Sequence, residues 1–114
     1  MDSGHYSRSI AYAGLLYISG QLGRTAHMTE QSAGDITAQT RRALESVATV
    51  AREAGSDLSK LLKVNVYVAD VAHWQAVNLE YARFLGQHRP ARTIIPVGAL
   101  HYGALVEIDA ICAL

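Results

Sequence analysis

The sequence predicts an α+β fold, in which a mixed β-sheet carries two helices packed on one of its faces. Apolar residues alternate with polar ones over 60–70 and 105–113, as in half-buried strands. They recur at spacings of three and four over 35–54 and 70–85, as in amphipathic helices. The predicted order is strand, strand, helix, strand, helix, strand, strand. Strands joined by whole helices run parallel and hairpin strands antiparallel, so the sheet is mixed.

The composition predicts one folded domain over residues 1–114. Half of the residues are hydrophobic and 18% are charged, which is typical of globular chains. Ten basic and ten acidic residues give no net charge, so no long-range field attracts nucleic acid or an anionic membrane surface. No apolar run approaches the ~20 residues that cross a bilayer, the N-terminal MDSGHYSRSI lacks a targeting pattern, and Cys112 is the single cysteine. We therefore expect a soluble cytoplasmic protein with no nucleic-acid or membrane partner.

The N-terminal region predicts a hairpin followed by a loop. Residues 9–19 are rich in Ile, Tyr and Leu around Gly14, which favours two strands that turn near Ala13. Residues 20–35 hold three glycines among polar residues without periodicity and are expected to form a loop. The stretch SGQLG at 19–23 is interpreted as a turn, which offers a hydroxyl and an unhindered backbone N–H at the rim of the sheet.

The two predicted helices, 35–54 and 70–85, each begin at an aspartate and are followed by a glycine. The inner stripe of the first is expected to be Ile36, Ala43, Leu44, Val47, Val50, Ala51 and Ala54. The inner face of the second is expected to be Trp74, Val77, Tyr81 and Phe84.

The last two strands, about 93–97 and 105–113, look like short apolar strands joined by a turn. In the final strand, alternation divides the side chains between two faces. Val106, Ile108, Ala110 and Cys112 are expected to face the helices. The opposite face holds Leu105, Glu107, Asp109 and Ile111. Acidic and large apolar residues together indicate a surface that packs against another subunit or lines a cleft.

Two charged residues stand out as candidates for chemistry. Arg92, at the start of a strand, is able to hold a carboxylate through two parallel hydrogen bonds, although a solvated arginine is the ordinary interpretation. Burial of Glu107 would raise its pKa toward a range useful for proton transfer, and a paired interface residue is the alternative. Asp109 is interpreted as structural. The histidines are scattered and Cys112 has the parity of the core, so we expect no metal site and no nucleophilic thiol.

Seven motifs, in order along nearly the whole chain, resemble the Rid (YjgF) family of reactive enamine/imine deaminases. They are GHY at 4–6, YISGQ at 17–21, Gln39, VNVYVAD at 64–70, VNLEY at 77–81, PAR at 90–92 and VEIDAI at 106–111. The resemblance implies a chorismate-mutase-like fold assembled as a homotrimer, with clefts between subunits. It also implies that Arg92 binds the substrate carboxylate, that Glu107 positions a water molecule, and that Tyr6, Ser19, Gly20 and Asn78 line the cleft. The implied reaction converts 2-imino acids to 2-keto acids and ammonia without a cofactor.

The sequence departs from the family pattern at two motifs. Ile94 stands two residues after the arginine, where many members have cysteine, and His5 stands where proline is usual. These departures bear on the substrate more than on the reaction. The alternatives are a deaminase dedicated to one pathway, of aminomuconate or aminoacrylate type, and a non-catalytic trimer that binds small carboxylates or proteins. A ribonuclease has little support, since no basic stripe is visible.

Overall fold

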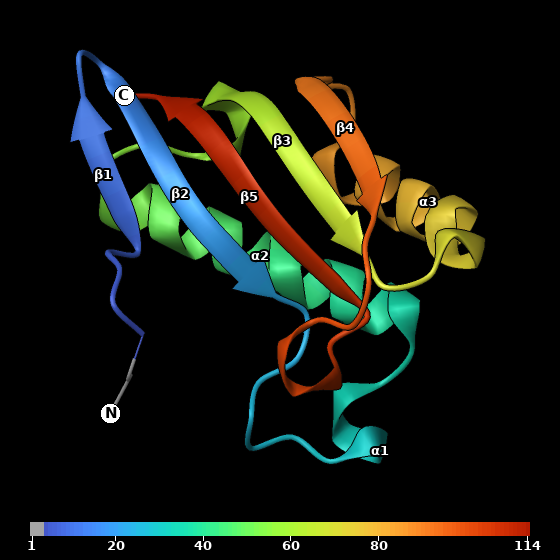
Figure 1. Cartoon of the computed structure of the whole chain (residues 1–114). Helices are drawn as coiled ribbons and strands as arrows, with labels where there is room; N and C mark the ends of the chain where they lie inside the picture. The colour runs from blue at the N-terminus through green and yellow to red at the C-terminus, as the bar shows by residue number, and fades with distance from the viewer. Residues whose placement is uncertain (1–3) are drawn as a thin grey trace.

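The structure, a computed structural model, describes residues 4–114, which form a five-stranded sheet with two long helices behind it (Figure 1). The strands are β1 (Ser9–Tyr12), β2 (Leu15–Leu22), β3 (Leu61–Val68), β4 (Ala91–Pro96) and β5 (Val106–Ala113). The helices are α1 (Glu30–Ala33), α2 (Ile36–Glu53) and α3 (Trp74–Leu85). Single 3₁₀ turns lie at η1 (Leu58–Lys60), η2 (Val71–His73) and η3 (His101–Gly103). The predicted mixed sheet with two helices on one face is confirmed.

The strand order across the sheet is β1-β2-β5-β3-β4. β1 and β2 form the predicted antiparallel hairpin, and β3 and β4, which α3 connects, are parallel. β5 runs antiparallel to both β2 and β3 and therefore occupies the centre. The last two strands are thus not neighbours: β5 crosses back to pair with strands much earlier in the chain. This placement pairs both edges of β5 with neighbouring strands.

The core lies between the sheet and the long helices. It includes the inward residues of β5 predicted from alternation, with Val106, Ile108 and Cys112 fully buried. Asp35 caps α2 by accepting a hydrogen bond from Ala38 N. The buried amide of Gln39, on α2, accepts a hydrogen bond at 2.9 Å from the backbone N–H of Leu105. This bond ties the helix to the residue that precedes β5, and so helps to fix the strand that carries Glu107.

Four details differ from the sequence prediction. Strand β2 continues to Leu22, because the SGQL stretch keeps pairing with β5 through a β-bulge instead of turning. The expected loop contains the short helix α1, which a capping box at Thr29 stabilises. Ala54 is exposed beyond the end of α2, and Trp74, in the first turn of α3, is exposed as well.

Among residues 4–114, no helix is long and apolar enough to span a membrane.

Candidate active site

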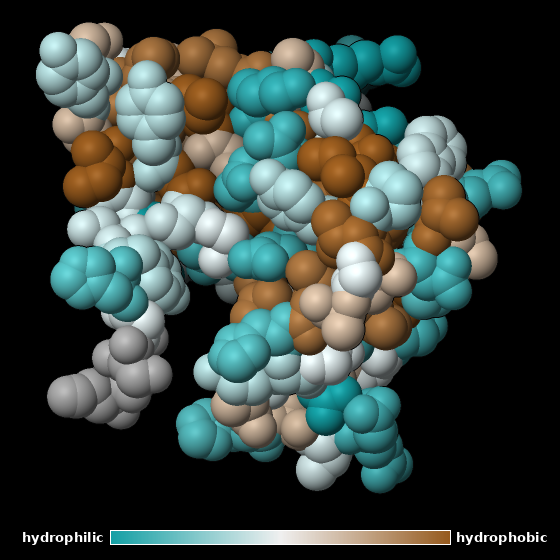
Figure 2. Space-filling view, viewed as in Figure 1, coloured by the Kyte–Doolittle hydropathy of each residue, from teal (hydrophilic) through white to brown (hydrophobic). Residues whose placement is uncertain are grey.

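The sheet face opposite the helices is open and hollowed, and Glu107 lies in its cleft. In Figure 2 hydrophilic side chains run down the middle of this face between hydrophobic areas, and the surface is recessed beside the N-terminal segment. The cleft has a volume of about 620 Å³. Four of the residues that the family resemblance pointed to, Tyr6, Ser19, Gly20 and Glu107, line it together. Glu107, Asp109 and Ile111 of the final strand share this face as predicted, whereas Leu105 precedes β5 and packs against the core instead.

The side chain of Glu107 lies directly against Gly20. The two residues Ser19 and Gly20 form the bulge in β2, where three steps along β2 match two steps along β5. A methyl group placed on Gly20 would overlap the carboxylate of Glu107. The bulge and the missing side chain thus allow the glutamate to lie over the β2 backbone.

Ser19 holds the N-terminal segment beside this cleft. Its hydroxyl donates to Ser7 O at 2.6 Å, and its backbone N–H donates to Arg8 O at 2.9 Å. These bonds fix the segment that carries Tyr6, a residue that is 58% exposed in a single chain. Ser19 therefore acts here by positioning Tyr6, and its oxygen retains accepting capacity toward a ligand.

Asp109 belongs to a hydrogen-bonded network next to Glu107. Its carboxylate accepts from Asn65 Nδ2 at 2.9 Å and from Tyr67 Oη at 2.7 Å. The bond to the carboxylate raises the pKa of Tyr67 to about 12, with burial as a second cause. Asp109 is thus occupied by structural partners, in agreement with its interpretation from the sequence.

Glu107 has the more unusual environment of the two acids. Burial raises the pKa of its carboxyl group, and the negative charge of Asp109 adds to the increase, whereas His101 opposes it. No side-chain hydrogen bond to Glu107 is formed by the rest of the described chain, residues 4–114. A carboxylate with a raised pKa and unused acceptor oxygens is suited to orient a water molecule and exchange a proton with it.

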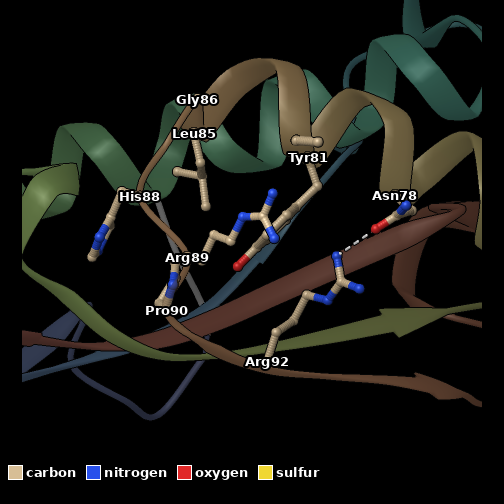
Figure 3. Close-up of a pocket in the computed structure, with 9 residues that line it drawn as sticks. Asn78, Tyr81, Leu85, Gly86, His88, Arg89, Pro90 and Arg92 are labelled. Carbon is tan, nitrogen blue, oxygen red and sulfur yellow. Dashed lines mark hydrogen bonds between the residues drawn. The ribbon is translucent and has the colours of Figure 1, made fainter.

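Arg92 and Asn78 form a second site on the helix side of the sheet. Arg92 Nη1 donates to Asn78 Oδ1 at 2.9 Å (Figure 3). The guanidinium lies 4.7 Å from the ring centroid of Tyr81 and 5.9 Å from that of Trp74, so both aromatic faces attract it. Arg92 is half-buried, and Asn78 and the two rings hold its side chain over α3.

A single chain does not bring Arg92 and Glu107 together. Arg92 pairs with Val64, which is buried under the helices, and its side chain reaches α3. Glu107 pairs with Tyr67 and faces the open cleft. The sheet itself separates the two groups. The predicted residues thus fall into two sets: Arg92 with Asn78 on one face, and Glu107 with Tyr6, Ser19 and Gly20 on the other.

Comparison with known proteins places the chain in a family. The model of the family described as endoribonuclease L-PSP matches residues 2–114. The chain belongs to this family. A Rid-family protein of Yersinia pestis, YyfA, has a crystal structure that aligns with a TM-score of 0.88 and 35% identity, covering 99% of this chain and 90% of that one. The resemblance to the Rid family seen in the sequence is confirmed.

Two curated relatives of this Rid-family chain are informative. A RutC family protein of Pyrococcus horikoshii is 36% identical over 108 residues, which cover 95% of this chain and 86% of the relative. The human 2-iminobutanoate/2-iminopropanoate deaminase is 30% identical over 108 residues, covering 95% of this chain and 79% of the enzyme. Named deaminases among the relatives support a deaminase-type hydrolase as the general activity.

Sequence reasoning missed several residues of the cleft in this Rid-family chain. Asn65, Tyr67 and Lys63 share one face of β3, and the alternation with Val64 and Val66 would have placed them there. His101, in η3, had no such signal, because a 3₁₀ turn has no period that assigns a face.

Among residues 4–114, no group of three or more His, Cys, Asp or Glu side chains gathers as metal ligands do. Ile94 packs against the core on the same side as Arg92.

Proposed function

We propose that the chain is an imine deaminase that converts 2-imino acids, such as the tautomer of 2-aminoacrylate, to 2-keto acids and ammonia. The observation that carries this proposal is the guanidinium of Arg92, which Asn78 and two aromatic rings hold in a defined orientation. A fixed guanidinium recognises a carboxylate through two parallel charge-assisted hydrogen bonds. The deaminases among the relatives support the reaction class.

The active site is proposed to form between copies of the chain, in a homotrimer. Arg92 and Asn78 of one copy would meet the cleft of Glu107, Tyr6, Ser19 and Gly20 of the next, since one chain holds these sets on opposite faces of its sheet. The open face offers exposed Tyr12, Tyr17 and Ile10 beside the cleft, and exposed large apolar side chains of this kind favour association.

The proposed mechanism adds water to a bound imine. Arg92 binds the carboxylate and so fixes the C=N carbon beside a water molecule that Glu107 orients. Glu107 accepts a proton from the water as the oxygen attacks carbon, and returns it to nitrogen. The hydroxyl proton of the resulting carbinolamine then passes through Glu107 to nitrogen as the C=O bond forms and the C–N bond breaks, which gives the keto acid and ammonia. Water supplies the oxygen and no electrons are exchanged, so these residues complete the reaction with acid–base chemistry.

The test compares Arg92 variants on freshly generated 2-aminoacrylate. Arg92→Ala is expected to lower kcat/KM by about ten- to a hundredfold, because a charge-assisted bond contributes roughly 1.5–3 kcal/mol. Arg92→Lys should keep the charge and lose the bidentate geometry. Arg52→Ala is the matched control, since Arg52 is an exposed arginine at the end of α2 whose side chain bonds only Thr49 within the described chain. Thermal melts and oligomer mass establish that each variant is folded.

The alternative is a non-catalytic trimer that binds small carboxylates. It predicts no acceleration of ammonia release by the wild-type chain, together with a rise in Tm when 2-oxobutanoate is added. Near-wild-type activity of a folded Arg92→Ala trimer would instead remove Arg92 from the site. The description of the family as endoribonuclease has little physical support here, because the chain has no net charge and two carboxylates lie in the cleft.

A further inference from the structure

The pocket that contains Arg92 is strongly basic. Its volume is about 470 Å³, and it lies between the end of α3 and the segment that leads into β4. Arg89, Arg92 and His88 line it, and none of the lining residues is acidic. Figure 3 shows Arg89 and Arg92 extending into this pocket toward Tyr81. Two guanidinium groups in one acid-free pocket favour a ligand with more than one negative charge.

Arg89 is available to such a ligand. Its side chain makes no hydrogen bond or ion pair with any residue from 4 to 114, whereas Arg92 is held by Asn78. The nearby buried acid of α3, Glu80, is already shared by Arg41 and Arg83. The positive charge of Arg89 therefore has no partner in the described chain and faces the pocket.

Tyr81 gives an independent indication of a ligand at this place. The residue is only 6% exposed, it lines the pocket, and its hydroxyl has no hydrogen-bond partner among residues 4–114. Leaving a buried hydroxyl without a partner costs about 1–3 kcal/mol. A ligand oxygen that reaches this hydroxyl would recover that cost. His88 is less free, since its Nε2 donates to Leu61 O at 2.8 Å.

We propose that Arg89 binds a second acidic group of the substrate, so that the site prefers imines of dicarboxylic amino acids such as glutamate. This inference rests on the proposed function, in which Arg92 binds the first carboxylate. Arg89 and Arg92 are three residues apart and enter one pocket, with the Tyr81 hydroxyl as a further donor. An uncharged side chain on the imine would leave Arg89 without a partner, which makes Arg89 the specificity residue.

The test uses two substrates that differ only in this charge. Imines are generated in situ from glutamate and from glutamine by amino-acid oxidases, and the imine that remains is trapped with semicarbazide. The wild-type chain is expected to favour the glutamate-derived imine in kcat/KM by about tenfold and not more, because Arg89 is exposed and solvent weakens its charge. Arg89→Gln should remove this preference and leave the glutamine-derived imine unaffected, and Arg89→Lys should retain part of it. Arg52→Gln is the matched control and should change neither value.

The outcomes separate this inference from the proposed function. Equal use of the two imines by the wild-type chain, or an equal loss of both in Arg89→Gln, overturns the role of Arg89 and leaves the deaminase intact. Acceleration of neither imine refutes the deaminase. In that case the Tm shift with 2-oxoglutarate is compared with that of 2-oxopentanoate, which has the same chain length and one carboxylate. A larger shift with 2-oxoglutarate that Arg89→Gln abolishes supports the second anion site, and equal shifts overturn it.

Discussion

A shared active site predicts that two inactive variants restore each other when they assemble together. Arg92→Ala removes the guanidinium that Asn78 holds on the helix side, and Glu107→Gln removes the carboxylate on the open face. Because these groups lie on opposite faces of one sheet, each complete site needs an Arg92 from one copy and a Glu107 from its neighbour. A mixed trimer then contains some interfaces in which both groups are intact.

The size of the recovery follows from the assembly. In every trimer that contains both variants, about one interface in three combines an intact Arg92 with an intact Glu107. The Arg92→Ala chain alone should retain about one to ten per cent of wild-type kcat/KM, from the loss of a charge-assisted bond. Recovery to about a third of wild-type activity in the isolated mixed trimers is therefore clearly above the activity of the Arg92→Ala chain.

The assay uses chains co-expressed with two different affinity tags, so that mixed assemblies are isolated before deaminase activity is measured. Their mass should be about three times the 12.3 kDa of one chain. A second mixture, wild type with the double variant Arg92→Ala, Glu107→Gln, acts as the control. In these isolated mixed trimers a shared site leaves about a sixth of the sites intact, whereas a site within one chain leaves about half.

The result that refutes the shared site is equally definite. If isolated mixed trimers of the two single variants show no more activity than the average of the variants alone, Arg92 and Glu107 do not act across an interface. A mass of one chain at micromolar concentration would also remove the site between copies. Half-maximal activity in the control mixture would place the whole site in one chain.

Three further predictions concern Glu107 and the glycine against which it lies. Because burial and Asp109 raise the pKa of Glu107 above its ordinary value of 4.5, kcat/KM should fall as the pH decreases through this raised value, and Glu107→Gln should lack that limb in a pH profile. The raised pKa also means that the folded chain binds this proton more tightly than the unfolded chain. The contribution of Glu107 to the free energy of unfolding should therefore decrease as the pH rises from about 4.5 through the folded-state pKa. The same pH dependence of Tm in Glu107→Gln would contradict this. Gly20→Ala should displace the Glu107 carboxylate and lower kcat by at least about tenfold. Gly98→Ala is the control and should keep wild-type kcat, because an added methyl group there meets nothing within 4 Å. Equal kcat in the two variants would show that Gly20 does not position Glu107.

Alternation in the strands predicted more of the molecule than any single motif. The parity of β5 correctly separated Val106, Ile108 and Cys112, which are buried, from Glu107 and Asp109 on the open face. A period of two assigns a side chain to a face as soon as one neighbour is known to be buried. The first helix was equally clear, because Asp35 caps α2 as predicted, whereas Asp70 caps the 3₁₀ turn η2 and α3 begins only at Trp74, without a side-chain cap.

The departures arose where pairing between distant segments decides the local structure. The glycines after Ser19 suggested a turn, but β5 offers β2 a ladder of hydrogen bonds that extends to Leu22 once a bulge is included. Likewise, β5 pairs with β2 and β3 instead of with β4, although β4 precedes it in the chain. Neither result can be predicted from a short stretch of sequence, since both depend on which strands pair in the folded sheet.

The division of the site explains why the sequence identified its residues but not their arrangement. Arg92 is the second residue of β4 and follows the parity of Val64, so it faces the helices, whereas Glu107 has the parity of Tyr67 and faces away. Two residues with opposite parity in one sheet cannot both contact one small ligand, however near they lie in the chain. A reaction that needs both therefore requires a second copy to turn its open face toward the Arg92 pocket. Under this constraint association is a condition for catalysis, and a substitution on the open face that prevents association should abolish activity even when Arg92, Asn78 and Glu107 are all unchanged.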